Sequence, residues 1–218
     1  MTGQLALDLG RRPALGREAF LVSSANAGAL AAVDAWADWP GGKLALVGGP
    51  GTGKTHLAHV WAESAGALVV QASAPGPLAL DADLLVVEDV DRIAGDRAAE
   101  ERLFHIHNAV LSRGGRLLLT GRAAPNHWPL VLPDLASRAS AAGVARLEAP
   151  DEALMAGVLV KLFADRHILP KPGLIDFLVP RLERSFAAAE AAVARLDAAA
   201  LSEGRAVGGR LASATLDL

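Results

Sequence analysis

The octapeptide Gly48-Gly49-Pro50-Gly51-Thr52-Gly53-Lys54-Thr55 decides the fold. It fits the pattern G-x-x-x-x-G-K-[ST], in which glycines let successive backbone N–H groups point at phosphate oxygens. An apolar run at 43–47 precedes it and a helical pattern at 55–65 follows it, so strand, loop and helix come in the required order. The sequence therefore predicts a phosphate-binding loop, to which the helix adds its positive N-terminal end. We expect Lys54 to reach the β and γ phosphates and the Thr55 hydroxyl to ligate Mg²⁺.

Apolar runs alternate with helical patterns along the first 149 residues. The runs predict further strands at 68–71, 84–87, 116–120 and 144–147, and the helical patterns lie at 98–113 and 133–139. This alternation is typical of an α/β fold with a parallel sheet flanked by helices. After Pro150 the strand signals stop, and three helices are predicted at 151–166, 172–182 and 187–201. We therefore expect a small all-helical C-terminal domain after the α/β part of the chain.

The predicted strand at 84–87 runs into two carboxylates, Glu88 and Asp89, about 35 residues after the phosphate loop. At the carboxyl end of a parallel strand, Glu88 is suited to hold Mg²⁺ and Asp89 to polarise a water molecule. The alternative is a pair of acids that only solvates a loop.

Composition excludes several classes of protein. The 218 residues are 52% hydrophobic and 21% charged, which excludes an intrinsically disordered chain. Cysteine is absent, so disulfides, thiolate zinc sites and cysteine nucleophiles are excluded. The formal net charge of -3 gives no global attraction to nucleic acid or to an anionic membrane. No signal peptide and no bilayer-spanning stretch is predicted, and we expect a cytoplasmic bacterial protein.

Three strings of sequence carry a resemblance to a known family. The string Gly53-Lys54-Thr55-His56-Leu57, with Phe20-Leu21-Val22 and Asn26 before it and Leu132-Pro133-Asp134-Leu135-Ala136-Ser137-Arg138 after it, resembles the AAA+ module of DnaA-homologous proteins. Among these it is most similar to the Hda-type members, over nearly the whole chain. The resemblance implies an AAA+ P-loop NTPase fold with a helical lid, which binds ADP or ATP with Mg²⁺. It adds Val22 and His56 to the nucleotide-binding residues.

The resemblance also implies roles for single residues. Thr120 is similar to the sensor that orients the attacking water, and Arg138 to an arginine finger that enters a neighbour's ATP site. The alternative for Arg138 is an ordinary surface arginine. Two positions depart from the family: Glu88 stands where Asp is usual, and Ala187 stands where the lid carries the sensor 2 arginine. Arg184, one turn earlier, is the candidate substitute, and we expect slow or absent intrinsic hydrolysis.

The N-terminal segment Gln4-Leu5-Ala6-Leu7-Asp8-Leu9 is similar to the sliding-clamp-binding peptide of Hda-type proteins. In such a peptide the side chain of Gln4 forms hydrogen bonds in a polar pocket of the clamp, while Leu5, Leu7 and Leu9 fill an apolar pocket. The alternative is a tail that folds back as an edge strand. We thus expect a clamp-binding tail at 1–17, an AAA+ nucleotide-binding domain at 18–149 and a helical lid at 150–218.

The leading hypothesis is a negative regulator of replication initiation. Bound to the DNA polymerase III sliding clamp (its β subunit), it would stimulate ATP hydrolysis by DnaA through Arg138. The length leaves no room for a helix-turn-helix domain of on the order of 90 residues, so we expect no direct sequence-specific DNA binding. A homodimer or homo-oligomer stays open. The alternatives are a helicase loader or other DnaA-like adaptor and, with less support, a P-loop kinase.

Overall fold

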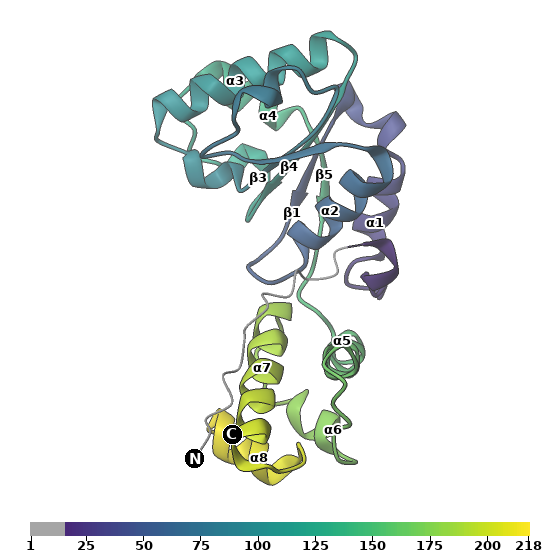
Figure 1. Ribbon diagram of the computed structural model, residues 1–218. Helices are drawn as coiled ribbons and strands as arrows, with labels where there is room; N and C mark the ends of the chain where they lie inside the picture. Colours follow the sequence, from purple (N-terminus) through teal and green to yellow (C-terminus); the bar gives the residue numbers. More distant parts are fainter. Residues whose placement is uncertain (1–15) are drawn as a thin grey trace.

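The computed structural model describes residues 16–218, so the predicted clamp-binding residues Gln4, Leu5, Leu7 and Leu9 lie outside the described part. A parallel five-stranded sheet lies between helices in the upper part of Figure 1, in the order β2-β3-β4-β1-β5. The strands are β1 Lys43–Val47, β2 Leu68–Gln71, β3 Leu84–Glu88, β4 Arg116–Gly121 and β5 Gly143–Arg146. All five strands predicted from the apolar runs are confirmed, with ends that differ by at most one residue.

Helices cover both faces of the sheet, as the apolar strands require. On one face lie α1 Ala27–Asp34 and α2 Lys54–Ala65, and on the other lie α3 Arg97–Ser112 and α4 Pro133–Ser140 (Figure 1). An apolar core lies on each face of the sheet, and alternate side chains of β4 belong to different cores. Leu118 packs toward α1 and α2, whereas Leu117 and Leu119 pack toward α3. Period-two alternation in a buried strand explains this division.

Short 3₁₀ helices connect several of these elements. Within the described residues they are η1 Arg17–Ala19, η2 Trp36–Asp38, η3 Pro40–Gly42, η4 Pro77–Leu80, η5 Val90–Ile93 and η6 Pro125–His127.

Four helices follow the sheet and enclose a separate apolar core. They are α5 Glu152–Asp165, α6 Leu174–Leu178, α7 Phe186–Glu203 and α8 Gly209–Leu216. Met155, Phe163 and Leu196 are fully buried between them. Asp151 caps α5, as its position predicts, because its Oδ1 accepts a hydrogen bond from the Leu154 N–H at 2.7 Å. These helices confirm the all-helical C-terminal region.

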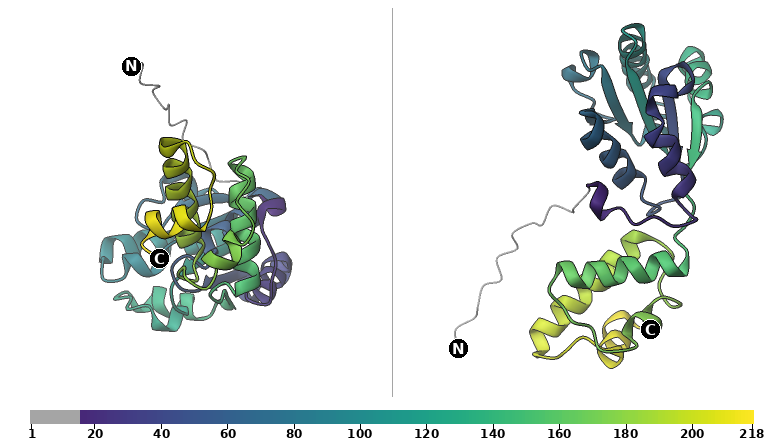
Figure 2. Two further views of the ribbon diagram at one scale, coloured as in Figure 1. Left: turned by 90° about the horizontal axis from the view of Figure 1, so that it is seen from below. Right: turned by 90° about the vertical axis from the view of Figure 1, so that its right-hand side faces the viewer.

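The predicted helix at 172–182 is wrong in length, because only Leu174–Leu178 is helical. Pro180 lacks the N–H that the next turn would need, and Gly173, at φ +78°, precedes the first turn. Figure 1 and the right-hand view of Figure 2 place the C-terminal helices beyond the sheet, at the end where α2 begins. Among the helices of residues 16–218, none is long and apolar enough to cross a membrane.

Candidate nucleotide-binding site

The predicted phosphate loop connects β1 to α2 and packs closely against β4 and the segment after β5. The Gly48 N–H donates to the Gly121 carbonyl at 3.3 Å. A Cβ atom on Gly48 would lie 2.6 Å from the Leu147 carbonyl oxygen, so no larger residue fits there without movement. Thr52 Oγ1 donates to the Gly49 carbonyl at 3.0 Å and closes the turn. The loop is therefore a compact backbone cradle at the carboxyl edge of the sheet.

Lys54 lies in the first turn of α2 and folds over this cradle. Its Nζ donates to the carbonyl oxygens of Gly48 at 2.8 Å and Gly49 at 2.7 Å. Burial lowers the pKa of Lys54, while the charges of Asp89 and Asp91 raise it. The two carbonyls are neutral acceptors, so an anionic phosphate oxygen is a stronger partner for the same ammonium group.

The acidic end of β3 meets the end of β4 beside the loop. The Asp89 N–H donates to Thr120 Oγ1 at 2.9 Å, which joins the predicted water-polarising residue to the predicted sensor. Asp89 itself adopts a left-handed backbone conformation at φ 56°, and its carboxylate forms a half-exposed ion pair with Arg92 at 3.1 Å. Sequence reasoning named Asp89 and Thr120 separately, and the structure brings them together.

Glu88 is buried with one carboxylate oxygen satisfied and one unpaired. Its Oε2 accepts a hydrogen bond from Gln71 Nε2 at 2.8 Å, whereas Oε1 has no partner among the described residues. The glutamine at the end of β2 was not predicted, because its contact depends on the pairing of β2 with β3.

Asp91 is a third acid of the site, and sequence reasoning missed it. Its Oδ2 accepts a hydrogen bond from the Arg122 backbone N–H at 3.2 Å, and its buried Oδ1 has no partner. The only signal in the sequence was its position three residues after the strand end. Burial is the largest influence on the pKa of Lys54 and lowers it. The charge of Asp89 raises this pKa, and the charge of Asp91 raises it by a smaller amount.

These carboxylates fit Mg²⁺ as part of a nucleotide complex. Glu88 and Asp91 each present an unpaired buried oxygen, the ligand type that Mg²⁺ prefers, and the Thr55 hydroxyl is exposed at the start of α2. Within residues 16–218 no group of three His, Cys, Asp or Glu residues could hold a metal by itself. Mg²⁺ would therefore depend on nucleotide phosphates for part of its coordination, and it would supply charge neutralisation there.

The start of α7 packs directly on the phosphate loop. The Phe186 N–H donates to the Gly51 carbonyl at 2.9 Å, and a Cβ atom on Gly53 would lie 2.8 Å from the Phe186 ring. Ala187, in the first turn of α7, is exposed. Arg184, the candidate substitute for the sensor 2 cation, forms an exposed ion pair with Glu152 of α5 at 2.6 Å.

Val22 lies in the segment that precedes α1, and His56 lies in the first turn of α2. Val22 is 56% exposed in a turn that buried Asn26 fixes, because Asn26 Oδ1 accepts from the Ser23 N–H at 2.8 Å. His56 meets the edge of the Phe20 ring at 5.2 Å between centroids. Burial lowers the pKa of His56.

Arg138 lies on a different surface from the phosphate loop. It is exposed on α4, with its guanidinium carbon 5.1 Å from the centroid of the Phe104 ring. Burial is the main cause of the lowered pKa of Lys43, and the positive charge of Arg138 lowers that pKa further. Lys43 is the first residue of β1, and the phosphate loop follows the last residue of β1. The length of this five-residue strand places the loop about 13 Å from Lys43. Within residues 16–218 no carboxylate forms an ion pair with Arg138.

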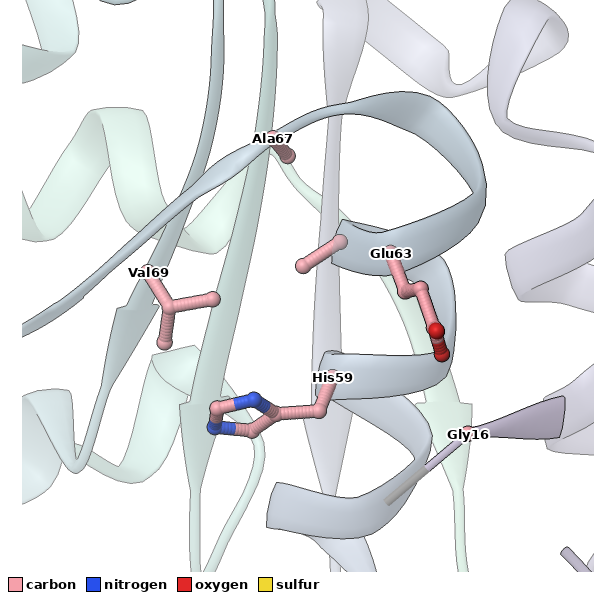
Figure 3. Close-up of a pocket in the computed structure, with 6 residues that line it drawn as sticks. Gly16, His59, Glu63, Ala67 and Val69 are labelled. Carbon is pink, nitrogen blue, oxygen red and sulfur yellow. The ribbon is translucent and has the colours of Figure 1, made fainter. Parts of the chain in front are cut away.

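A shallow hollow of about 400 Å³ lies beside α2 and β2 (Figure 3). His59 and Glu63 of α2 line it together with Ala67, Val69 and Gly16. The loop residues are absent from its lining, so the hollow is separate from the nucleotide site.

Comparison with known proteins assigns the fold. No protein-family model matches the chain. The chromosomal replication initiator protein DnaA of Thermomicrobium roseum is 27% identical over 217 residues, covering 88% of this chain and 47% of that protein. Domain III of the Thermotoga maritima replication initiation protein DnaA matches with a TM-score of 0.83 at 21% identity, covering 94% of this chain and 97% of that one. The chain has the AAA+ P-loop NTPase fold.

This AAA+ chain is homologous to DnaA at modest identity. It spans less than half the length of the curated DnaA relatives that it matches. DnaA from Aquifex aeolicus, solved with AMPPCP bound, has a TM-score of 0.68 at 19% identity, covering 83% of this chain and 64% of that one. At these identities the solved structures show the fold alone.

Proposed function

We propose that the chain is an Hda-type regulator that binds ADP or ATP with Mg²⁺ and limits replication initiation. Its nucleotide would be held by the loop Gly48–Thr55, with Glu88 toward Mg²⁺ and Asp89 and Thr120 toward the attacking water. The compact cradle, the Asp89–Thr120 hydrogen bond and the unpaired oxygen of Glu88 support this part. The AMPPCP bound to Aquifex aeolicus DnaA adds support from a protein of the same fold.

The regulatory part of the proposal rests on Arg138. An arginine that acts in a neighbour's site must be exposed, held in direction and free of a competing carboxylate. Arg138 meets these conditions: it is exposed, it stacks on Phe104, and it makes no ion pair within residues 16–218. A cation–π contact made by an exposed arginine is worth about 0.5–1 kcal/mol, which is enough to bias the direction of the side chain and too little to fix it. We infer that Arg138 completes the ATP site of DnaA.

We also propose a role for each of three parts of the chain. Residues 1–17 form the clamp-binding tail through Gln4, Leu5, Leu7 and Leu9. Residues 18–149 form the nucleotide-binding domain and residues 150–218 its lid. Because Ala187 offers no cation to the nucleotide and Arg184 pairs with Glu152, the chain itself hydrolyses ATP slowly or not at all.

The test measures ADP production from DnaA preloaded with labelled ATP. We expect the chain to raise it by roughly a hundredfold or more when the sliding clamp is loaded on DNA, as an added arginine finger does. Omission of the clamp, or Gln4→Ala in the tail, removes most of this increase. Absence of any increase rejects the regulator. Failure of the clamp to retain the intact chain rejects the tail assignment and favours another DnaA-like adaptor, such as a helicase loader.

A further inference from the structure

The strand β2 forms one edge of the sheet, and its outer side is open. β3 pairs with the inner side in parallel register. The Ala72 N–H donates to the Glu88 carbonyl at 2.9 Å, and backbone groups alternate in direction along a strand, so the N–H and C=O of Val69 point away from β3. Within residues 16–218 the only pairing on the outer side is a bridge between Gln71 and Ala74. β2 can therefore accept a further strand.

The side chains of β2 leave apolar surface on both faces of this edge. Leu68, Val69 and Val70 are half-buried, whereas every residue of β1 is buried. Val69 lines the hollow of about 400 Å³ in Figure 3, and Leu68 lines a second hollow of about 420 Å³ on the other face. Leu78, which is 69% exposed, also lines the second hollow. An apolar edge without lysine or proline is one that proteins usually cover.

The described part of the chain begins beside this edge. Gly16 lines the first hollow together with Val69. Among the 15 residues that precede it, Leu5, Leu7 and Leu9 alternate with a small and an acidic residue, as the side chains of a half-buried strand do. Residues 10–15 can span up to about 20 Å, which exceeds the length of the four-residue strand β2. The leucine segment can therefore reach the outer side of β2.

The charges at the second hollow complement the residues that follow the leucines. Asp81 lines this hollow, is exposed and forms no ion pair within residues 16–218. Asp83 also lines it and pairs with Arg113 at 3.2 Å. Arg11 and Arg12 lie between the leucine segment and the described chain. An arginine beside Asp81 adds a modest attraction that salt weakens, so the apolar contacts and the strand pairing carry most of the docking.

We propose that residues 4–9 add to the outer side of β2 as a further strand, and that this docking competes with binding of the same residues to the sliding clamp. The inference rests on the proposed clamp-binding role of the tail and gives the tail a second partner within its own chain. Pairing satisfies the outward N–H and C=O of Val69, and the leucines cover apolar surface beside β2. Docking lowers the apparent affinity for the clamp in proportion to the fraction of chains whose tail is free.

The first test measures amide hydrogen exchange of β2 in the full chain by mass spectrometry. We expect Leu7→Asp to speed this exchange by about tenfold or more, because a carboxylate in place of an apolar side chain removes the added strand. Saturating sliding clamp has the same effect on the wild-type chain. Exchange of β1, in the interior of the sheet, stays unchanged in both cases. Equal exchange of β2 in all three samples overturns the proposal.

The second test changes the docking surface and leaves the tail intact. We expect Leu78→Ser to lower the dissociation constant for the clamp by about threefold or more, because it frees the tail. This gain cannot exceed the factor by which Leu7→Asp speeds exchange of β2, since both measurements report the same docked fraction. The matched control is Leu201→Ser, which changes a leucine of α7 that is 79% exposed, and it leaves the constant at the wild-type value. An unchanged constant for Leu78→Ser contradicts the competition.

Disulfide formation identifies the segment that occupies the edge, because the chain has no cysteine. Val69→Cys is combined in turn with Leu5→Cys, Leu7→Cys or Leu9→Cys, and at least one pair should form a disulfide within a single chain. A product with the mass of two chains assigns the edge to the tail of a second copy and overturns the proposal. The proposed clamp-binding role fails separately, when the clamp retains neither the wild-type chain nor Leu78→Ser.

Discussion

Among single residues, the buried pair Lys43 and His107 has a consequence for acid stability. Lys43 Nζ lies 3.2 Å from His107 Nε2, and His107 Nδ1 lies 3.3 Å from Asn108 Oδ1. A charged lysine donates to Nε2, so His107 is neutral with its proton on Nδ1. Burial, then the charge of Lys43 and more weakly that of Arg138, lower the pKa of His107 to about 4.

We predict that His107 makes the protein less stable as the pH falls from 6.5 to 4. The unfolded histidine titrates near 6.5 and the folded one near 4, so between these values the unfolded chain binds more protons. The free energy of unfolding should fall by up to about 3 kcal/mol over this range. Urea denaturation at several pH values measures it, with His107→Gln, which keeps an acceptor for Lys43, showing a smaller slope than wild type. The matched control His105→Gln changes an exposed histidine of the same helix, and equal slopes in all three proteins contradict the prediction.

The residues of the site divide by how far sequence could predict them. Lys54 and Thr55 belong to a pattern with fixed spacing, and Glu88 and Asp89 end a strand that its apolar residues announce. Asp91 and Arg122 had no such signal, because they follow strands and face each other only once β3 and β4 pair. The sequence alone predicts that polar residues follow a strand. Which loops contact each other depends on the order of the strands in the sheet, which the sequence pattern does not give.

Among the elements, α4 owes its position to a buried glutamate on α3. Glu100 is fully buried, and its carboxylate accepts N–H groups from Gly95 at 2.8 Å, Val131 at 3.1 Å and Leu132 at 2.7 Å. Leu132 is the N-cap residue of α4, which carries Arg138. Glu100 thus holds the start of that helix against α3.

We expect Glu100→Ala to lower the free energy of unfolding by about 3–5 kcal/mol, because it leaves three backbone N–H groups without their buried acceptor. Urea denaturation measures this loss. The neighbouring Glu101 forms only an exposed ion pair with Arg97, so Glu101→Ala should cost less than about 1 kcal/mol. Similar losses for the two variants would show that the Glu100 contacts do not stabilise α4.

The contact between α7 and the phosphate loop gives a second prediction for the elements. Gly51 has φ +68°, and a Cβ atom on it would lie 2.6 Å from Ser185 Cβ, at the cap of α7. Gly51→Ala should therefore cost about 1 kcal/mol for the left-handed backbone and about 1–3 kcal/mol more for the clash. Gly66→Ala is the control, since Gly66 has φ +73° with no atom within 4 Å. Equal losses of unfolding free energy would mean that α7 does not press on the loop.

Sequence predicted the elements unevenly, for physical reasons. Strands with long apolar side chains were found almost to the residue. α1 and α8 were missed because their buried faces are small, Ala29, Leu30 and Val33 in α1 and Leu211 and Ala212 in α8, and glycines lie in or beside both. A glycine lowers helix propensity by about 1 kcal/mol, so packing decides these helices.

For the whole molecule, the polarity of the parallel sheet separates the phosphate loop from Arg138. The phosphate loop, Asp89 and Thr120 lie at the carboxyl ends of the strands. Arg138 lies near Lys43, at the opposite end of β1. The loop lies about 13 Å from Lys43 along that strand, so Arg138 is better placed for a nucleotide on another protein. We therefore expect Arg138 to act on DnaA-bound ATP and to contribute nothing to nucleotide binding by its own chain.

The most direct measurement of that expectation is single-turnover hydrolysis of labelled ATP bound to DnaA, with the chain held on clamp-loaded DNA. We predict that Arg138→Ala and Arg138→Lys lose nearly all of the stimulation, roughly a hundredfold or more as for other arginine fingers, while their own affinity for ADP is unchanged. Arg97→Ala, which removes an exposed cation of α3, keeps full stimulation. Equal ADP production with wild type and Arg138→Ala would contradict the account.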